Sequence, residues 1–178
     1  DRLKGLGLDI GILTGDNRYV AEVIAKELNI KTVLSEVLPG SKSKEIKKMQ
    51  AKGLTVGMVG DGVNDAPALA QADLGIAVGS GADVAIEASD ITLMSNDLTA
   101  VVDAIELSNK TMAKVRQNLF WAFFYNCLGI PIAAGMLYPI FGILLSPVYA
   151  ALAMTLSSVS VISNSLLLKK FTPKARIL

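Results

Sequence analysis

The sequence predicts an α/β domain with a parallel, doubly wound sheet, followed by a helical stalk and two transmembrane α-helices. Two observations predict this fold class. Short apolar runs alternate with amphipathic stretches over residues 1–97, as in parallel sheets covered by helices. No charged residue occurs between Arg116 and Lys169, a stretch long enough for two spans of roughly 20 residues. We therefore expect the α/β part at 1–97, the stalk at 98–116 and the membrane part at 117–178.

Composition excludes several classes of function. The chain has no His and one Cys, Cys127, which excludes His-dependent catalysis and an internal disulfide. A net charge of +1 gives no basis for a nucleic-acid partner. The first residues, DRLKGLG, contain neither Met nor an apolar signal region, so we expect the chain to begin inside a larger protein.

Five apolar runs predict the strands, each short enough to be buried on both faces: 10–13, 32–34, 55–59, 74–78 and 91–94. Between the first two, the spacing of Val20, Val23, Ile24 and Leu28 predicts a helix over 19–28 that is buried on that face. The alternation indicates a Rossmann-like sheet, in which ligands bind at the loops that follow the carboxyl ends of the strands.

The first such loop is Thr14-Gly15-Asp16-Asn17. The glycine allows close approach of a ligand to the backbone, the threonine offers a hydroxyl, and a helix begins just after it. A strand-to-helix turn capped by Asp or Asn explains these residues as well, and taken alone they favour it.

The second loop, GDGVNDAP at residues 60–67, carries two carboxylates, Asp61 and Asp65. Carboxylates after a buried strand suit an oxygen-binding divalent ion such as Mg²⁺. A glycine-rich loop with an Asn or Asp cap is a weaker alternative, because one cap does not require two Asp, an Asn and two Gly.

A third loop precedes a helix expected to begin with Ser41 as its N-cap. Lys42 and Lys44 would then lie in the first turn, where cations oppose the helix dipole unless an anion is bound there. A solvated lysine-rich face is the alternative. Together Thr14, Lys42 and Asp61 could bind a phosphoryl group, although no strand of this chain ends in an Asp suited to be the nucleophile.

The motifs TGDN and GDGVNDAPAL, continued by LGIAVGSGADVAIEASDITLM, resemble those of P-type ATPases, and the match covers essentially the whole chain. The resemblance implies a haloacid-dehalogenase-like phosphorylation domain, ATP as substrate and Mg²⁺ as cofactor. Asp61 would hold Mg²⁺, with Asp65 supporting its loop. The implied catalytic residues are Thr14, Gly15, Asp16, Lys42 and Asn64: the first two contact the phosphoryl group, Lys42 neutralises its charge and Asn64 donates a hydrogen bond to it.

The family's phosphorylated Asp, in a DKTG loop, is absent from this sequence. The chain therefore resembles only the C-terminal segment of such a pump and should be inactive alone. The implied partners are the nucleotide-binding, actuator and earlier membrane segments of the same pump.

We expect the membrane helices at about 119–137 and 148–168. Cations flank them on both sides: Lys110, Lys114, Arg116, Lys169, Lys170, Lys174 and Arg176. By the positive-inside rule both flanks are cytoplasmic, which agrees with an even number of spans.

Polar residues lie near the middle of both spans. Tyr125 and Asn126 lie in the first, and Met154, Ser157 and Ser158 share one face of the second. Neither span contains a carboxylate, which argues against a pathway for Ca²⁺, Na⁺ or Mg²⁺, and a thioether suits a soft monovalent ion such as Cu(I). Packing between helices is the alternative for each residue taken singly.

The segments FFYNCLGIPIAAG and AMTLSSVSVISN resemble the Tyr-Asn and Met-x-x-Ser-Ser motifs of copper(I)-transporting heavy-metal ATPases. The resemblance implies Cu(I) coordination by Tyr125, Asn126, Met154 and a serine, either Ser158, which is preferred, or Ser157. It also implies a place in the cell membrane among its lipids, and delivery by a copper chaperone. Zinc-transporting relatives are expected to carry a Lys and an Asp in these spans, and this chain has neither. Ag(I) is an alternative cargo. A membrane-anchored phosphatase of the same fold, or a non-catalytic assembly module, is an alternative function.

Overall fold

The computed structural model describes residues 1–61, 63–79, 83–142 and 146–173, which form two compact units, Asp1–Val102 and Asp103–Leu178. Gly62 of the second loop and the flanking cations Lys174 and Arg176 lie outside the described residues. Each unit is described by itself.

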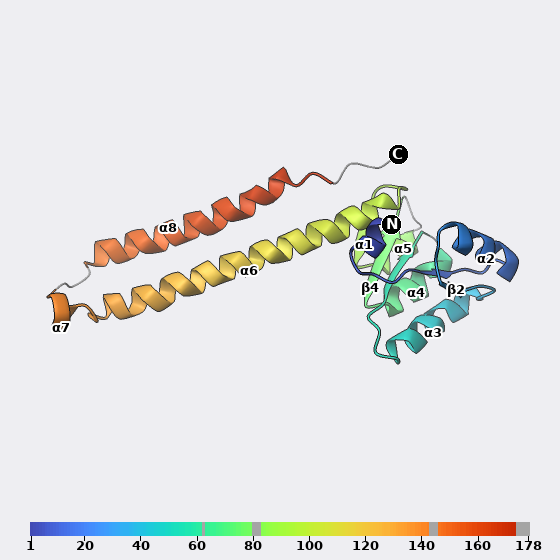
Figure 1. Cartoon of the computed structure of the whole chain (residues 1–178), viewed down its shortest axis with the longest axis horizontal. Helices are drawn as coiled ribbons and strands as arrows, with labels where there is room; N and C mark the ends of the chain where they lie inside the picture. The colour runs from blue at the N-terminus through green and yellow to red at the C-terminus, as the bar shows by residue number, and fades with distance from the viewer. Residues whose placement is uncertain (62, 80–82, 143–145, 174–178) are drawn as a thin grey trace. The chain divides into compact units, whose positions relative to one another are not determined.

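The first unit alternates strands and helices as the fold class predicts (Figure 1). Its elements are α1 (Arg2–Gly5), β1 (Gly11–Leu13), α2 (Arg18–Glu27), β2 (Thr32–Leu34), α3 (Pro39–Gln50), β3 (Gly57–Gly60), η1 (Val63–Asp65), α4 (Ala66–Gln71), β4 (Leu74–Val78), α5 (Asp83–Glu87) and β5 (Ile91–Leu93). Each strand lies within two residues of its expected position, so the predicted α/β class is confirmed.

All described strand pairs are parallel, but the strands fall into two sheets. β1 pairs with β2, with Gly11 opposite Thr32, whereas β3, β4 and β5 form the second sheet in that order. Alternating strands and helices fix the parallel direction, but they do not determine which strands become neighbours. β1 and β3 each therefore have one edge without a paired strand among the described residues.

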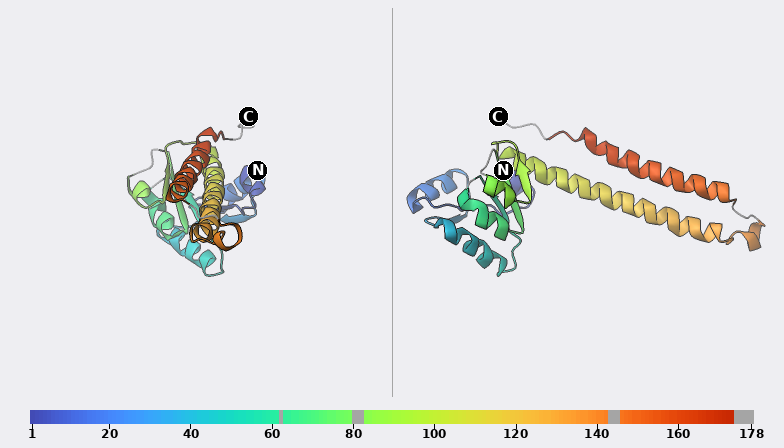
Figure 2. Two further views of the ribbon diagram at one scale, coloured as in Figure 1. Left: turned by 90° about the vertical axis from the view of Figure 1, so that its left-hand side faces the viewer. Right: turned by 180° about the vertical axis from the view of Figure 1, so that it is seen from behind.

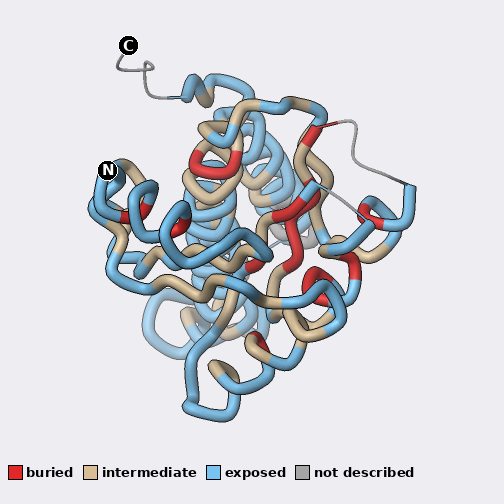
Figure 3. Tube along the Cα trace, turned by 90° about the vertical axis from the view of Figure 1, so that its right-hand side faces the viewer, coloured by how far each residue is buried: buried red, intermediate tan, exposed pale blue. Residues whose placement is uncertain are grey.

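The core of this unit lies between α3, α4, α5 and β3. Its buried cluster, part of the red segments in Figure 3, comprises Ile46, Met58, Ala68, Leu69 and Ala85. α3 packs against α4, and α4 packs against β3 and β4. This packing fixes α3 and α4 relative to the carboxyl end of β3.

The expected buried face of α2 was wrong. Val20, Val23, Ile24 and Leu28 are between 41% and 56% exposed, and the buried residues are Ala21 and Ala25. Small side chains allow a helix backbone to approach a sheet closely, so the alanine face packs inward while the larger side chains remain at its borders.

The second unit contains most of α6 (Thr99–Ala133), then α7 (Tyr138–Phe141), α8 (Pro147–Leu166) and η2 (Leu167–Lys170). α6 and α8 run antiparallel and are connected through α7, as both views in Figure 2 show. Ser146 caps α8: its Oγ accepts the Val148 N–H, and Pro147 follows at the first helical position, where no N–H is needed.

Within the described part of the chain, one segment is long and apolar enough to cross a membrane, Ala151–Lys170. It overlaps the second expected span. The first expected span, 119–137, is not one continuous helix, because α6 ends at Ala133. The charge-free part of α6, residues 117–133, is shorter than the roughly 20 residues of a full span, so that span stays a prediction.

Candidate functional site

The loop that follows β1 is organised around Thr14. Its hydroxyl donates to Asp16 Oδ2 at 2.8 Å and accepts the Asp16 backbone N–H at 3.1 Å. Asn17 is the N-cap of α2, and its side chain accepts the Val20 N–H at 2.9 Å. Because Asn17 performs the capping, the Asp16 carboxylate remains available to orient the Thr14 hydroxyl.

The loop that follows β2 forms two backbone hydrogen bonds with the turn at residues 14–16. The Glu36 N–H donates to the Asp16 carbonyl at 2.9 Å, and the Val37 N–H donates to the Thr14 carbonyl at 3.1 Å. Glu36 has a φ of 57°, a left-handed conformation that is uncommon for a residue other than glycine. The neighbouring loop therefore fixes the backbone of residues 14–16 through hydrogen bonds.

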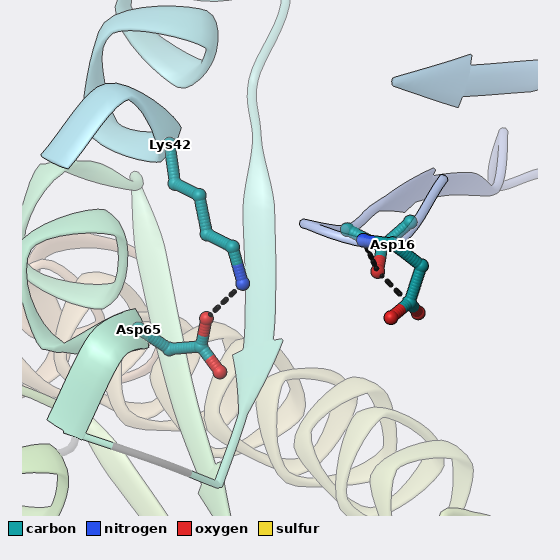
Figure 4. A network of polar contacts seen from close by, with 4 residues as sticks. Asp16, Lys42 and Asp65 are labelled. Carbon is teal, nitrogen blue, oxygen red and sulfur yellow. Dashed lines mark hydrogen bonds and ion pairs between the residues drawn. The ribbon is translucent and has the colours of Figure 1, made fainter. Parts of the chain in front are cut away.

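Lys42 and Asp65 form an ion pair that is largely enclosed by the protein. Lys42 Nζ lies 2.6 Å from Asp65 Oδ1, and both side chains are only 14% exposed. Figure 4 shows them pointing toward one another, with Asp16 on a separate loop. A charge-assisted hydrogen bond of this length is stronger than one between neutral groups.

The expected start of the helix carrying Lys42 was wrong. α3 begins at Pro39, with Leu38 as its N-cap, so Ser41 lies inside the helix and Lys42 is its fourth residue. Proline suits the first helical position because the N–H it lacks would have no partner there. The nearest charge to the Lys42 ammonium is the Asp65 carboxylate, at 2.6 Å.

Asp65 occupies the N-cap position of α4, yet its side chain makes no capping hydrogen bond. Its carboxylate lies against Gly60 at the end of β3: a Cβ at Gly60 would be 2.7 Å from Asp65 Cβ and 2.9 Å from Oδ2. The absence of a side chain at Gly60 thus makes room for the carboxylate that binds Lys42.

Replacing Gly60 with alanine should destabilise the protein by about 1–3 kcal/mol, because the new methyl group overlaps Asp65. Thermal unfolding of the purified protein measures the change. Gly57→Ala is the matched control in the same strand, since a Cβ there would find its nearest neighbour, the Leu74 carbonyl, at 3.9 Å. Equal unfolding temperatures for the two variants would contradict the packing of Asp65 on Gly60.

Asp61 follows β3 directly and is exposed, and Asn64 lies exposed in η1. Among the described residues nothing forms a hydrogen bond or ion pair with the Asp61 carboxylate, and no cluster of three acidic, His or Cys residues occurs. Mg²⁺ commonly binds through one or two carboxylates together with water and phosphate oxygens. Asp61 fits that requirement, whereas the Asp65 carboxylate is already bound to Lys42.

The structure brings the predicted phosphoryl-site residues together only in part. Thr14 and Asp16 form one group and Lys42 and Asp65 another, and in the described part of the chain no hydrogen bond connects the two. Gly15 is exposed between Thr14 and Asp16. Both groups follow the carboxyl ends of strands, where the sheet class places ligands.

Among the described residues, no hydrogen bond joins the predicted ion-site residues of α6, Tyr125 and Asn126, to those of α8, Met154 and Ser158. Tyr125 is 43% exposed and stacks on Trp121, and Met154 is 73% exposed. Asn126 Nδ2 donates to the Ala122 carbonyl at 3.0 Å, and Ser158 Oγ donates to the Met154 carbonyl at 3.2 Å. The Asn126 amide and the Ser158 hydroxyl thus donate within their own helices, which leaves the outer faces of α6 and α8 open to further ligands or helices.

Two groups of contacts do not follow from the pattern of the sequence. One is the Lys42–Asp65 pair, whose members lie 23 residues apart with no local spacing signal. The other connects α6 and α8 through the side chains of Lys114, Gln117, Asn118, Asn164 and Ser165. The sequence signal for this second group is a set of uncharged polar residues close to both ends of the charge-free stretch, where such side chains can form hydrogen bonds between helices.

Comparison with known families supports the fold. Two family models of haloacid dehalogenase-like hydrolases match, one over residues 1–73 and the other over residues 42–105. A protein of Archaeoglobus fulgidus named a probable copper-exporting P-type ATPase is 60% identical over 174 residues, 98% of this chain. A copper-exporting P-type ATPase of Legionella pneumophila is 55% identical over 96% of the chain.

A crystal structure of a zinc-transporting PIB-type ATPase matches 94% of this chain with a TM-score of 0.79 and 37% identity. The chain matches one segment of P-type ATPases. It spans 22% of the Archaeoglobus fulgidus relative, 23% of the Legionella pneumophila relative and 26% of the zinc-transporting structure. In this P-type ATPase segment, the two haloacid dehalogenase-like matches together cover the unit that carries Lys42, Asp61 and Asp65.

Proposed function

We propose that this chain supplies part of the phosphorylation domain and two membrane helices of a pump that exports Cu(I) at the expense of ATP. The observation that carries the proposal is its high identity, over nearly its whole length, to relatives named copper exporters. The charge-free stretch with Tyr125, Asn126 and Met154 supports the same cargo, because soft ligands without carboxylates suit a soft monovalent ion.

In the phosphorylation step, an Asp from the remainder of the pump would attack the γ-phosphorus of ATP, and the bond to ADP would break. Lys42, oriented by Asp65, would face the charge on the phosphoryl oxygens with the N–H donors that Asp65 does not use. The Thr14 hydroxyl, the Gly15 backbone N–H and the Asn64 amide would donate hydrogen bonds to the same group. Asp61 would hold Mg²⁺, which supplies positive charge beside those oxygens when bound.

The flanking lysines and arginines support a cytoplasmic position for both ends of the helix pair. We place the pump in the cell membrane, surrounded by lipid. Its nucleotide-binding and actuator domains and its earlier membrane segments would be the partners of this chain, and a copper chaperone would deliver the ion.

ATP hydrolysis by the full-length protein, supplied in turn with Cu(I), Ag(I), Zn²⁺ or no metal, tests the cargo. Cu(I) should stimulate hydrolysis several-fold, and Zn²⁺ should not, because the charge-free helices offer no carboxylate to a divalent ion. Stimulation by Zn²⁺ alone would contradict the proposal.

Ag(I) is a second candidate cargo. A silver-exporting P-type ATPase of Salmonella typhimurium is 56% identical over 95% of the chain, and Ag(I) has the same charge and softness as Cu(I). Stronger stimulation by Ag(I) than by Cu(I) in the same assay would favour it.

A membrane-anchored phosphatase is the alternative from another class, favoured by the haloacid dehalogenase-like hydrolase match over residues 1–73. It predicts hydrolysis of small phosphate esters at a rate that no metal cargo changes. The assay separates the two functions when such an ester replaces ATP.

A further inference from the structure

A network of side chains links α6 to α8, and Asn164 is at its centre. Lys114 Nζ donates to Asn164 Oδ1 at 2.7 Å, and Asn164 Nδ2 donates to Asn118 Oδ1 at 2.7 Å. Asn164 Nδ2 also lies 3.4 Å from Gln117 Oε1, and Asn118 Nδ2 donates to Ser165 Oγ at 2.9 Å. The α6–α8 network comprises Lys114, Gln117, Asn118, Asn164 and Ser165.

These contacts differ from those of the other polar residues on the two helices. Thr111, Asn126, Thr155 and Ser158 each donate to a backbone carbonyl one turn earlier in their own helix. Such bonds satisfy a donor without connecting helices. The network residues instead make contacts across the gap between α6 and α8, and Ser165 Oγ in addition donates to the Val161 carbonyl of its own helix at 2.9 Å.

The network borders a groove of about 240 Å³ between the two helices. Its lining comprises Gln117, Asn118, Trp121 and Tyr125 from α6, and Ser160, Val161 and Asn164 from α8. The groove is therefore lined both by network residues and by Tyr125, which is a predicted ion-site residue.

Helix periodicity extends this link to the other ion-site residues. Asn118 and Tyr125 are seven residues apart, which is about two turns, so they share one face of α6. On α8, Ser158 precedes Ser165 by seven residues and Met154 precedes it by eleven, about three turns. The α8 face that Ser165 occupies is thus the face that carries Met154 and Ser158.

We propose that the α6–α8 network is a positioning element for the ion site: it fixes the rotation of each helix, so that Tyr125 on α6 and Met154 and Ser158 on α8 are held toward a common side. This inference rests on the proposed transport function. Asn164, which contacts three residues of α6, is the principal positioning residue.

The chemistry of the network suits this role. A carboxamide without a hydrogen-bond partner in apolar surroundings raises the free energy of the protein, so a rotation of either helix that separates Asn118 from Asn164 is disfavoured. A single polar pair can define the alignment of two helices that apolar packing alone leaves open. Because lipid-facing helices lack a hydrophobic drive to associate, interhelical hydrogen bonds contribute much of that alignment.

Asn164→Ala in the full-length protein tests the inference, with Thr111→Val as the matched control, since Thr111 bonds only within α6. The Cu(I) concentration for half-maximal ATPase stimulation should rise about 10-fold in the Asn164 variant, as expected from the loss of two or three interhelical bonds. Phosphorylation by inorganic phosphate with no Cu(I) present should remain at the wild-type level in both variants, because it does not use the ion site.

A double-mutant cycle separates positioning from general destabilisation. Asn118→Ala and Asn164→Ala should each raise the half-maximal concentration, and the double variant should raise it little further, because each single change already breaks their bond. Multiplicative effects of the two changes, or an Asn164 variant equal to Thr111→Val, would overturn the inference.

The outcomes distinguish this inference from the proposed function. A wild-type protein without Cu(I) stimulation would overturn the proposed function and, with it, the role of the network. A stimulated wild type with an unaffected Asn164→Ala variant would overturn the network alone. A fall in maximal rate and in phosphorylation by inorganic phosphate, with no change in the half-maximal Cu(I) concentration, would indicate a merely structural role and also contradict the inference.

Discussion

Replacing Asp61 with asparagine in the full-length pump should abolish Mg²⁺-dependent phosphorylation from ATP, a loss on the order of 100-fold or more. Asp61 follows β3, is exposed, and has no ion-pair partner among the described residues. Its negative charge is therefore available to a cation. Asparagine keeps the shape of the side chain and removes the charge, so the affinity for Mg²⁺ falls while the fold is retained.

Phosphoenzyme formed from labelled ATP at several Mg²⁺ concentrations measures this effect. Asp9→Asn is the matched control, because Asp9 is also exposed but precedes β1, at the amino end of the strand. The control should form phosphoenzyme at the wild-type level. Normal phosphoenzyme in the Asp61 variant would refute the assignment of Mg²⁺ to this residue.

Met154→Leu should remove Cu(I)-stimulated ATP hydrolysis and leave the protein folded. Methionine and leucine have similar volumes, so the exchange usually costs less than about 1.5 kcal/mol even in a packed interior. Met154 is 73% exposed, which reduces its part in packing further. The main change is therefore the loss of a soft sulfur ligand.

Hydrolysis with and without Cu(I), together with thermal unfolding, measures both halves of this expectation. Met112→Leu on α6 is the control, since it makes the same substitution at a half-exposed position outside the predicted ion site. If the Met154 variant responds to Cu(I) as the wild type does, the thioether serves packing alone.

The sequence predicted the strands well because each is a short apolar run between turn residues. β4, Leu74–Val78, appeared at its expected bounds. Local patterns do not reveal contacts between elements, which explains the errors. The buried face of α2 is set by how closely Ala21 and Ala25 allow it to approach the sheet, and the pairing of strands depends on which edges meet.

The site residues show the same division. Thr14, Asp61 and Lys42 could be selected from the sequence because each lies in or beside a loop that follows a strand. The geometry between them could not, because Asp65 reaches Lys42 across 23 residues and packs on Gly60. In α6 and α8, the spacing of residues along the sequence indicated which of them share a helix face. The hydrogen bond between Asn118 and Asn164 could not be predicted in this way, because it depends on how the two helices align.

If the chain takes part in the proposed phosphoryl transfer, the contact between Lys42 and Asp65 affects how phosphate leaves the site. An incoming phosphate dianion must draw the ammonium partly away from a carboxylate that already neutralises it. When the phosphate departs, the ammonium would return to that carboxylate, so its charge would again be neutralised by Asp65. The Asp65 counter-ion would therefore lower the affinity of this site for phosphate. Phosphate would be released more easily than from a lysine that has no carboxylate beside it.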